Sequence, residues 1–421
     1  MWGLTLPESL RVRQFRCYMT TLFLSRAGGW GQTIVVGMIA LQGGLWALFG
    51  TVAIGLAPRM FLGSWGGNII DRYPHHKVML WASSVQLGQA LGLCVLQFTG
   101  NLNLWGLYPL ILLGNVASMV FGTAQPVYIM RLVPYSLLNN ARYINNLTGQ
   151  LAIALGAVIG GLLSAPGQLG WLFLLNTASF LPFMRVLRHM REGKRARPVQ
   201  KKEKVKMREA LEYLGQKREV RLAVVVYFVV TTCMSGSMLQ QLTGYALGGP
   251  HAYSLLVTAA SIGEFCTALV QSLRGRRRYS NVISLLGWSA WLCFFLMLGR
   301  GATSLWLAMF CLAVASVGLN AINIIATELI VNEVPEHIQG RMSAIDMMAA
   351  NDGMLLNGLL VCLMLQTFKF AGVHTVAIGF TGSGLIFVGL VWVLHPRGLR
   401  LALSSTCLLW TLYKFRFRRH K

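Results

Sequence analysis

The chain has 421 residues, of which 55% are hydrophobic and 12% are charged, and its formal net charge is +24 at pH 7. A soluble domain carries about 25% charged residues, so this composition excludes an ordinary soluble protein and favours one that crosses a membrane. The basic residues lie in the gaps between long uncharged apolar segments, which argues against a nucleic-acid-binding protein.

Twelve apolar segments follow one another along the chain, and each is long enough to cross a bilayer as a helix. The expected spans are 16–41, 45–70, 78–99, 104–131, 143–165, 168–188, 222–245, 250–273, 281–299, 303–329, 342–366 and 371–394. In this topology, 33 of the 37 Lys and Arg residues fall on one side of the membrane. The positive-inside rule makes that side the cytoplasm, so we expect a multi-pass protein of the cell inner membrane with both termini cytoplasmic.

The first expected span contains a charged residue, Arg26, about ten residues from its start and therefore about 15 Å deep. A charge at the bilayer centre costs at least ~2.5 kcal/mol, so an ionisable residue inside a span is a functional candidate. We interpret Arg26 as a counter-ion or an anion-binding group, with a structural ion pair between helices as the alternative. Trp30 and Gln32 on the same span are candidates for lining a substrate cavity.

The turn between the second and third expected spans combines acidic and basic residues in the motif Gly67-Asn-Ile-Ile-Asp71-Arg72-Tyr-Pro-His75-His76-Lys77. Its glycine permits close approach of two helices, and Asp71 is placed to pair with a cation or a helix N-terminus of a neighbouring span. Such a pair predicts a latch on the cytoplasmic side. The alternative is an ordinary basic turn that obeys the positive-inside rule.

Polar and small residues mark the next two spans. The fourth expected span holds a neutral amide, Asn115, which is a further candidate for the cavity. In the fifth, small residues recur, namely Gly149, Gly156, Ala157, Gly160 and Gly161. Because small residues let two helix backbones touch, the fifth span is predicted to pack closely against its neighbours.

A long polar stretch, residues 189–221, divides the chain into residues 1–188 and 222–395, which we expect to be two six-helix halves. The halves resemble each other weakly, since Val133-Pro134 precedes the fifth expected span and Val334-Pro335 precedes the eleventh. Many secondary transporters are built from such an internal repeat and bind substrate near the midplane between the repeats.

The linker and the tail are expected to lie at the membrane surface. A short interfacial helix is predicted near residues 208–215 of the linker. The basic tail 396–421 contains an apolar stretch of about 14 residues, which is too short to cross a bilayer. We expect anionic lipid headgroups to attract both segments.

The second half contains its own intramembrane carboxylates. Glu264 lies deep in the eighth expected span and Asp352 in the eleventh. We expect these two to be protonation sites, because desolvation disfavours an ionised carboxylate, and a structural ion pair is again the alternative. Residues nearer the cytoplasmic ends are assigned to the gate: Glu328, Gly340, Arg341 and Asp346. Further candidates for the cavity are Gln240 and Gln241 in the seventh span and Asn320 and Asn323 in the tenth.

These motifs resemble those of the major facilitator superfamily. The turn from Gly67 to Lys77 is similar to its loop signature G-x-x-x-D-R-x-x-R-R-K, with His75 and His76 in place of two arginines. The run Gly156-Ala157-Val-Ile-Gly160-Gly161 resembles its fifth-span antiporter motif, with alanine in place of proline. Phe173-Leu-Leu-Asn176 and Val334-Pro335-Glu-His-Ile-Gln-Gly340-Arg341 are similar to the enterobactin-exporter and drug-efflux branch.

The resemblance implies an all-α membrane protein with twelve transmembrane helices in two pseudo-symmetric six-helix bundles, the major facilitator fold. It implies proton-driven export of a small organic molecule, siderophore-like or drug-like, by alternating access. The residue inventory itself suggests an amphipathic or anionic substrate. Alternatives are an importer or a lipid flippase of the same fold, and a non-transporting membrane receptor or scaffold.

The expected partners are therefore a small-molecule substrate, a proton and membrane lipids, and the protein is expected to be a monomer. The sequence has no nucleotide-binding Gly-Lys-Ser/Thr loop and no clustered metal ligands. We accordingly expect neither an enzyme nor a bound cofactor or metal.

Overall fold

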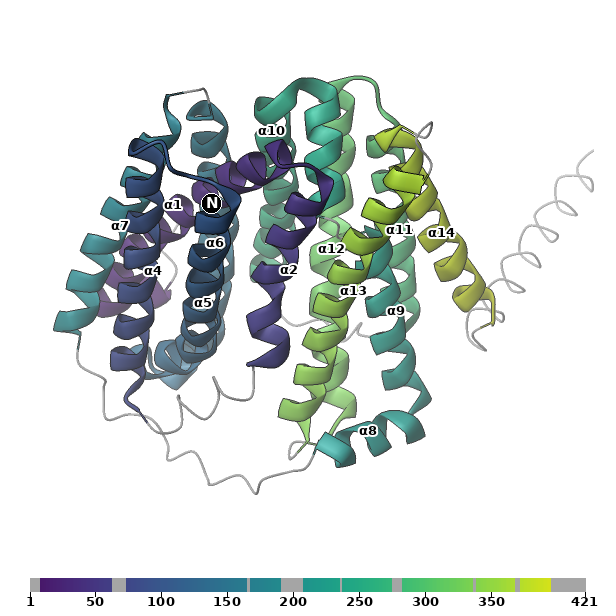
Figure 1. Cartoon of the computed structure of the whole chain (residues 1–421). Helices are drawn as coiled ribbons and strands as arrows, with labels where there is room; N and C mark the ends of the chain where they lie inside the picture. Colours follow the sequence, from purple (N-terminus) through teal and green to yellow (C-terminus); the bar gives the residue numbers. More distant parts are fainter. Residues whose placement is uncertain are drawn as a thin grey trace, which may run out of the picture.

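The structure is a computed structural model that describes residues 8–62, 73–164, 167–190, 207–234, 237–274, 282–335, 338–367 and 372–394. The described residues are helical apart from short connections (Figure 1). The elements in chain order are η1 Glu8–Arg11, α1 Arg13–Gln42, α2 Leu45–Phe61, α4 His75–Phe98, α5 Leu104–Leu132, η2 Tyr135–Leu137, α6 Leu138–Leu162, α7 Leu169–His189, α8 Met207–Gln216, α9 Arg218–Met234, α10 Ser237–Arg274, α11 Val282–Gly301, α12 Leu305–Glu333, α13 Gln339–Thr367 and α14 Val373–Leu394.

The twelve expected spans correspond to these helices. Within the described residues, nine helical segments are long and apolar enough to cross a membrane, and α2 is a shorter apolar helix. One of the nine, Arg218–Val270, covers two expected spans, and α1 supplies the first span of the chain. Helices prevail because lipid offers no partner for backbone N–H and C=O groups. The all-helical membrane fold predicted from the sequence is confirmed.

Helix α10 is really two helices joined by a sharp turn. Gly248 and Gly249 are non-helical, and Gly249 has φ +73°, a conformation that glycine adopts without steric cost. Pro250 then begins the second arm, where its missing N–H costs nothing. The two arms lie close together, because a Cβ at Gly244 would stand 2.5 Å from the Cα of Tyr253. The sequence Gly248-Gly249-Pro250 therefore separates the seventh and eighth spans.

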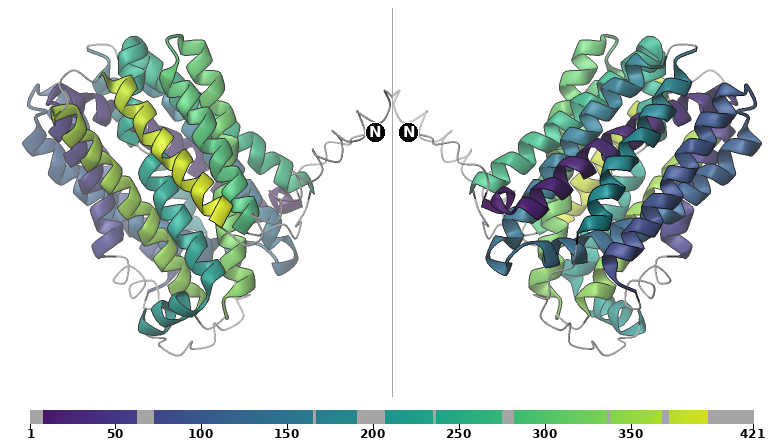
Figure 2. Two further views of the ribbon diagram at one scale, coloured as in Figure 1. Left: turned by 90° about the vertical axis from the view of Figure 1, so that its right-hand side faces the viewer. Right: turned by 90° about the vertical axis from the view of Figure 1, so that its left-hand side faces the viewer.

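The helices form two halves that lie side by side. Figure 1 shows α4, α5 and α7 in blue to teal on the left and α9 and α11 to α14 in teal, green and yellow on the right, with α2 and α10 near the centre of the view. Figure 2 shows the molecule from its two flanks, where the helices of each half run at a slant across one another. We call the end where α7 finishes and α9 begins the linker side, and the opposite end, with the turn at Gly248 and Gly249, the far side.

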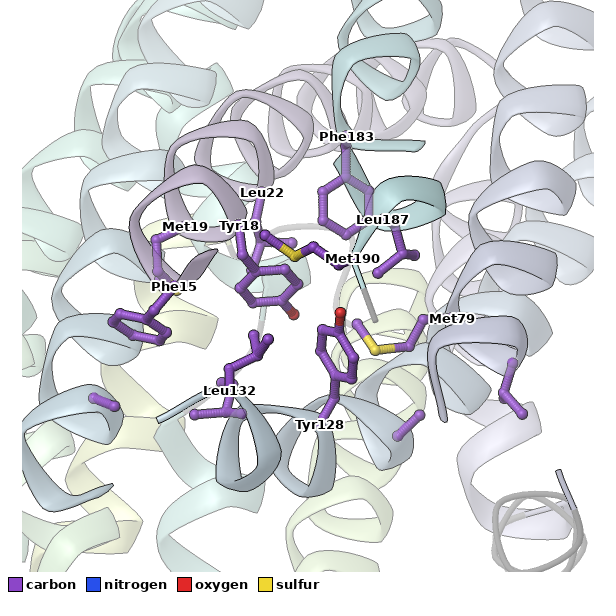
Figure 3. Packing of buried hydrophobic residues seen from close by; sticks show 14 of the residues in the cluster. Phe15, Tyr18, Met19, Leu22, Met79, Tyr128, Leu132, Phe183, Leu187 and Met190 are labelled. Atoms are coloured by element: carbon purple, nitrogen blue, oxygen red, sulfur yellow. The ribbon is translucent and has the colours of Figure 1, made fainter. Parts of the chain in front are cut away.

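On the linker side, each half has a hydrophobic cluster of its own. In the first half, Tyr18 and Tyr128 stack edge to face with ring centroids 5.5 Å apart, and Phe183 packs against Tyr18 (Figure 3). In the second half, Val220, Val334 and further apolar residues form another cluster. Dispersion contacts of this kind hold helices together where lipid removes the hydrophobic driving force. Each of these two clusters is built from a single half.

On the far side, the hydrophobic clusters draw residues from both halves. Ala40 and Leu48 of the first half pack with Leu239 and Val361 of the second. A neighbouring cluster adds Tyr253 and Val257 to residues of α1, α4, α5 and α7. Trp46 also donates a hydrogen bond from Nε1 to Oε1 of Gln366 at 3.1 Å. The two halves are thus joined at the far side.

Some expected segments are only partly described. Helix α8 confirms the short helix expected near residues 208–215, and the Tyr213 hydroxyl donates a hydrogen bond to the Glu333 carbonyl at the end of α12. Residues 191–206 of the linker and the whole tail 396–421 lie outside the described residues. Helix α1 begins and α14 ends on the linker side, as an even number of spans requires.

Candidate functional site

A cavity of about 870 Å³ lies between the halves. Most of its walls come from α1, α2, α4, α5 and α6, while Gln241, Tyr253 and Met354 of the second half close it. Pockets for small molecules commonly measure about 300–1,000 Å³, so this cavity has the size of a small-molecule site.

The cavity contains many polar side chains among apolar ones and carries positive charge. Arg26 and Arg59 line it, whereas the lining residues that the structure describes include no Asp or Glu. Nine lining residues have amide side chains, namely Gln32, Gln86, Gln89, Asn115, Gln125, Asn145, Asn146, Gln150 and Gln241. Amides donate and accept hydrogen bonds without charge, so they solvate a polar ligand without opposing its sign.

Arg26 is held by neutral groups from two other helices. Its Nη2 donates to Oε1 of Gln125 on α5 at 3.0 Å, and its Nη1 donates to the backbone carbonyl of Asn145 on α6 at 3.3 Å. Gln125 in turn donates from Nε2 to Oδ1 of Asn145 at 2.9 Å. These three bonds close a ring that fixes the guanidinium in place, and all of its acceptors are uncharged.

A second amide chain crosses the first half. Asn176 on α7 donates from Nδ2 to Oε1 of Gln32 at 2.7 Å, and Gln32 donates from Nε2 to Oε1 of Gln89 on α4 at 3.3 Å. The chain links α7, α1 and α4 across the membrane interior and orients Gln32 and Gln89 at the cavity wall. Trp30, predicted beside Gln32, lines the same cavity.

Glu264 lines a smaller cavity of about 290 Å³ in the second half, together with Gln240 and Arg300. Gln150 of α6 is a hydrogen-bond partner of its carboxyl group, and Nδ2 of Asn320 donates to its backbone carbonyl at 2.8 Å. The two cavities share five lining residues: Trp30, Gln150, Ile153, Tyr253 and Met354. Gln150 therefore touches both the cationic cavity and the carboxylate.

Of three other predicted polar residues, two lie away from these cavities and one lines the large cavity. Asp352 is exposed on α13 and lines neither of them. Asn323 accepts a hydrogen bond from the Tyr227 hydroxyl, so it links α12 to α9. Asn115 lines the large cavity, but its Nδ2 donates to the Ile111 carbonyl of its own helix at 2.9 Å.

The predicted gating residues are only partly described. Gly67, Asp71 and Arg72 lie outside the described residues, whereas His75, His76 and Lys77 form the first turn of α4 behind Pro74. His75 is buried and Lys77 is exposed. In the second half, Asp346 is half-buried on α13 and Arg341 is exposed. Glu328 belongs to α12 and Gly340 to α13, but their surroundings lie outside what the structure describes.

The predicted small-residue motif packs α6 against two helices. A Cβ at Gly156 would stand 2.3 Å from the carbonyl oxygen of Ala27, and one at Gly160 would stand 3.0 Å from that of Gly31. On another face, Gly161 abuts Ser254 of α10, and Ala157 is fully buried. Gly149 leaves room for Arg26, whose Nη1 would lie 3.5 Å from an added Cβ. The motif thus allows α6 to touch α1 and the second half at once.

Sequence reasoning singled out Arg26 and Glu264 but missed the amides that surround them. Gln125, Asn145 and Gln150 place the two charges, and Gln89 extends the amide chain. One available signal was the spacing of Asn145, Asn146, Gly149 and Gln150, which puts small and amide groups on one side of a helix. Their partners on α1, α5 and α10 come only from the fold.

Comparisons with known proteins agree with this architecture. The model of a major facilitator (MFS) family described as "Transmembrane secretion effector" matches residues 7–396. A crystal structure of a mutant of the nucleoside transporter NupG is similar with a TM-score of 0.71 and 13% identity, over 90% of this chain and 98% of that one. No curated protein matches the sequence.

Two further solved structures share the fold. A POT family transporter in complex with a thioalcohol-conjugated peptide matches with a TM-score of 0.66 and 13% identity, over 92% of this chain and 96% of that one. A bacterial homologue of the iron transporter ferroportin, in an inward-facing state, matches with a TM-score of 0.64 and 15% identity, over 91% of this chain and 99% of that one. At these identities the likeness concerns the fold alone.

Proposed function

Since the chain belongs to the transmembrane secretion effector family of major facilitator transporters, we propose that it exports a small organic molecule, siderophore-like or drug-like, by proton-driven alternating access. The cavity between the halves is the cargo site of this proposal.

One observation carries the proposal: among the described residues, the hydrophobic clusters to which both halves contribute lie toward the far side. Ala40, Leu48, Leu239 and Val361 seal the far side, whereas the clusters around Tyr18 and around Val334 on the linker side each stay within one half. Two halves that share hydrophobic clusters at one end and line a cavity between them form an arrangement from which rocking can expose a site to alternate sides. The linker side is the expected cytoplasmic side, so this state is the one that receives cargo for export.

The packing of α6 supports export as the direction. The run from Gly156 to Gly161 resembles the superfamily's antiporter motif, and it brings α6 into contact with α1 and with α10 of the other half. A helix that touches both halves is placed to transmit a change in one half to the other. The family description, which concerns secretion, points the same way.

Glu264 is the carboxylate that we propose to carry the proton. It lies within a membrane-spanning helix, where an ionisable side chain is expensive and functional by default. Its partner Gln150 comes from the other half and also lines the cargo cavity. Loading or unloading of the proton therefore acts on a contact between the halves, next to the cargo. Asp352 is exposed and lies outside both cavities, so we propose that it has at most a secondary part in proton coupling.

Flux into inside-out membrane vesicles tests the direction and the coupling. We expect vesicles containing the protein, when acidified inside by respiration, to accumulate 5-carboxyfluorescein or rhodamine 123 above the level of control vesicles, and a protonophore to abolish the difference. Accumulation of neither dye beyond the control, with the protein present in the membrane, would contradict the proposal. Dye uptake that the protonophore leaves unchanged would contradict proton coupling.

A further inference from the structure

The charge of the cargo cavity is unbalanced among the described residues. Arg26 and Arg59 both line it, and no carboxylate of the described part of the chain does. Moving a guanidinium from water into the protein interior costs free energy, and the cost is higher when no opposite charge lies beside it. Within the described residues, the hydrogen bonds of Arg26 go only to an amide oxygen and a backbone carbonyl. The described part of the cavity wall therefore leaves the countercharge of Arg26 to be supplied by another group, such as a ligand.

The position of Arg26 is fixed by the fold. A long arginine side chain near the end of a span can extend toward the interface, where water solvates it. Arg26 is instead anchored in the middle of α1 by bonds from α5 and α6, and Gly149 provides the space that it occupies. A guanidinium has five N–H donors, and the bonds to Gln125 and Asn145 account for two of them. The remaining N–H donors of Arg26 have no acceptor among the described residues, so they are available to a ligand in the cavity that Arg26 lines.

A second donor in the cavity wall, beside Gly37 and about three turns along α1 from Arg26, also lacks an acceptor. Nε2 of Gln241 is buried without a hydrogen-bond partner, and the residue, 4% exposed, lines the same cavity. A buried donor that lacks an acceptor costs about 1–3 kcal/mol, so a site rich in such donors favours a ligand that brings acceptors. Gln241 belongs to the second half, so an acceptor bound there also touches the far-side wall.

We propose that the cargo is an organic anion whose carboxylate or other oxyanion supplies the countercharge of Arg26, while Gln241 and the other amides bind its remaining polar groups. The inference rests on the proposed function in taking this cavity as the cargo site. Guanidinium groups bind planar oxyanions through two parallel hydrogen bonds. Arg26 should therefore select its ligand by the planar shape of the oxyanion as well as by its negative charge. Arg59 at the cavity wall adds a second attraction.

Thiol reaction rates measure the charge preference without knowledge of the cargo. We place a cysteine at Ser118, which lines the cavity on α5 two turns, or about 10 Å, before Gln125. The native cysteines are replaced, and none of the described ones lines this cavity. In purified protein, the thiol is reacted with two methanethiosulfonates of opposite charge, the ethylsulfonate and the ethyltrimethylammonium. A cysteine at exposed Thr99, in an uncharged far-side turn, is the control.

We expect the ratio of anionic to cationic reaction rates to be several-fold higher at Ser118→Cys than at Thr99→Cys. Arg26→Gln should lower the Ser118→Cys ratio about tenfold, the order expected of one unit charge acting over roughly 10 Å. Arg26→Lys keeps the positive charge, so it should keep the ratio of the two rates. If the glutamine variant fails to fold, the rates are measured in Arg26→Lys instead. Equal ratios at the two cysteines, or a ratio that Arg26→Gln leaves unchanged in folded protein, would overturn the inference.

Transport of two dyes of related structure and opposite charge provides the second arm. We expect 5-carboxyfluorescein to be carried in preference to rhodamine 123, and preferential transport of rhodamine 123 would overturn the inference. The thiol rates distinguish the two proposals. If the cavity prefers the anionic reagent but the protein carries neither dye, the anion site is supported and the transport function is contradicted. If the protein carries the dyes but the cavity shows no charge preference, the transport function is supported and the anion site is contradicted.

Discussion

At the residue scale, the chemistry of the protein is set by two charges in adjoining cavities. Arg26 lies in a ring of neutral acceptors, and Glu264 lies in the smaller cavity beyond a shared wall. Gln150 lines both cavities and contacts the Glu264 carboxyl. Because Gln150 lies between the cavity that Arg26 lines and the Glu264 carboxyl group, a change of charge at either residue alters the field that the other experiences.

Glu264→Gln should abolish dye accumulation driven by a pH gradient, because an amide cannot take up and release the proton. It retains the size of the side chain and a polar partner for Gln150, so the protein should remain folded in the membrane. The dependence of transport on pH should disappear in the same variant. Proteoliposomes with an imposed pH gradient provide the measurement.

Asp352→Asn is the matched comparison, since it also removes a carboxylate from a membrane-spanning helix. Asp352 is exposed and lines neither cavity, so we expect this variant to keep at least about half of the wild-type accumulation. The opposite pattern, an inactive Asp352→Asn variant and an active Glu264→Gln variant, would show that the proton is carried by Asp352 of α13 and not by Glu264 of α10.

Gln125→Met should weaken the hold on Arg26, because methionine fills the space of glutamine but offers only a weak acceptor. We expect a several-fold loss of the anionic preference measured at Ser118→Cys, with Arg26 itself unchanged. Gln86→Met removes another amide that lines the cavity but lies outside the hydrogen-bonded ring around Arg26, and it should leave that preference nearly intact. Equal losses in the two variants would show that Gln125 has no special part in placing the guanidinium.

At the element scale, the small-residue face of α6 determines how closely the helices approach. Gly156 meets the backbone of Ala27, and Gly161 meets Ser254 of the other half. Such contacts allow van der Waals attraction between backbones, which is the main source of helix association in lipid. They also position Asn145 and Gln150, on the same helix, beside Arg26 and Glu264.

Gly156→Ala should lower the thermal stability of the protein in detergent. The added Cβ would lie 2.3 Å from the Ala27 carbonyl oxygen, so the helices must separate, and overpacking of this kind typically costs about 1–3 kcal/mol. Gly88→Ala on α4 is the control, because nothing lies within 4 Å of its added Cβ. Thermal unfolding followed by fluorescence-detected gel filtration compares the two. Equal midpoints would show that the α1–α6 contact is looser than described.

The elements themselves were largely predictable, because lipid leaves helices as the available choice and the apolar lengths set their number. The break in α10 was predictable too, since Gly248-Gly249-Pro250 marks a turn. The ring around Arg26 was not, because its members lie about 100 residues or more apart in the chain, apart from Gln125 and Asn145. Asn320 shows where prediction from the sequence ends. Its sequence context suggested a residue of the cavity wall, whereas its side chain donates a hydrogen bond to the backbone of α10.

At the scale of the whole molecule, the two halves are joined on the far side and carry separate clusters on the linker side. Trp46 of α2 and Gln366 of α13 bridge the closed end. A cycle of transport requires this end to open, so a covalent link across it should stop the cycle. The described residues of the hydrophobic cluster there are all apolar.

A reversible link between Trp46→Cys and Gln366→Cys should therefore block dye transport. A bifunctional methanethiosulfonate makes the link, and a reducing agent removes it and should restore the rate. Trp46→Cys alone, treated with the same reagent, is the control for simple modification. Full transport by the doubly substituted, linked protein would show that the far side need not open.

Export of an organic anion should also respond to voltage. Moving one elementary charge across the membrane is worth about 2.3 kcal/mol per 100 mV, and an interior negative potential favours the exit of an anion. We expect proteoliposomes loaded with 5-carboxyfluorescein to release it faster when potassium and valinomycin make their interior negative. A rate independent of the potential would contradict export of net negative charge.

The access of the cavity from the two faces of the membrane is the most direct test of alternating access. A cysteine at Ser118, in protein without its native cysteines, is labelled by a membrane-impermeant maleimide in inside-out and in right-side-out vesicles. We predict labelling from both faces, faster from the linker side, where the halves carry separate clusters. Labelling from a single face, unchanged by an imposed pH gradient, would contradict a transporter whose halves rock about this cavity.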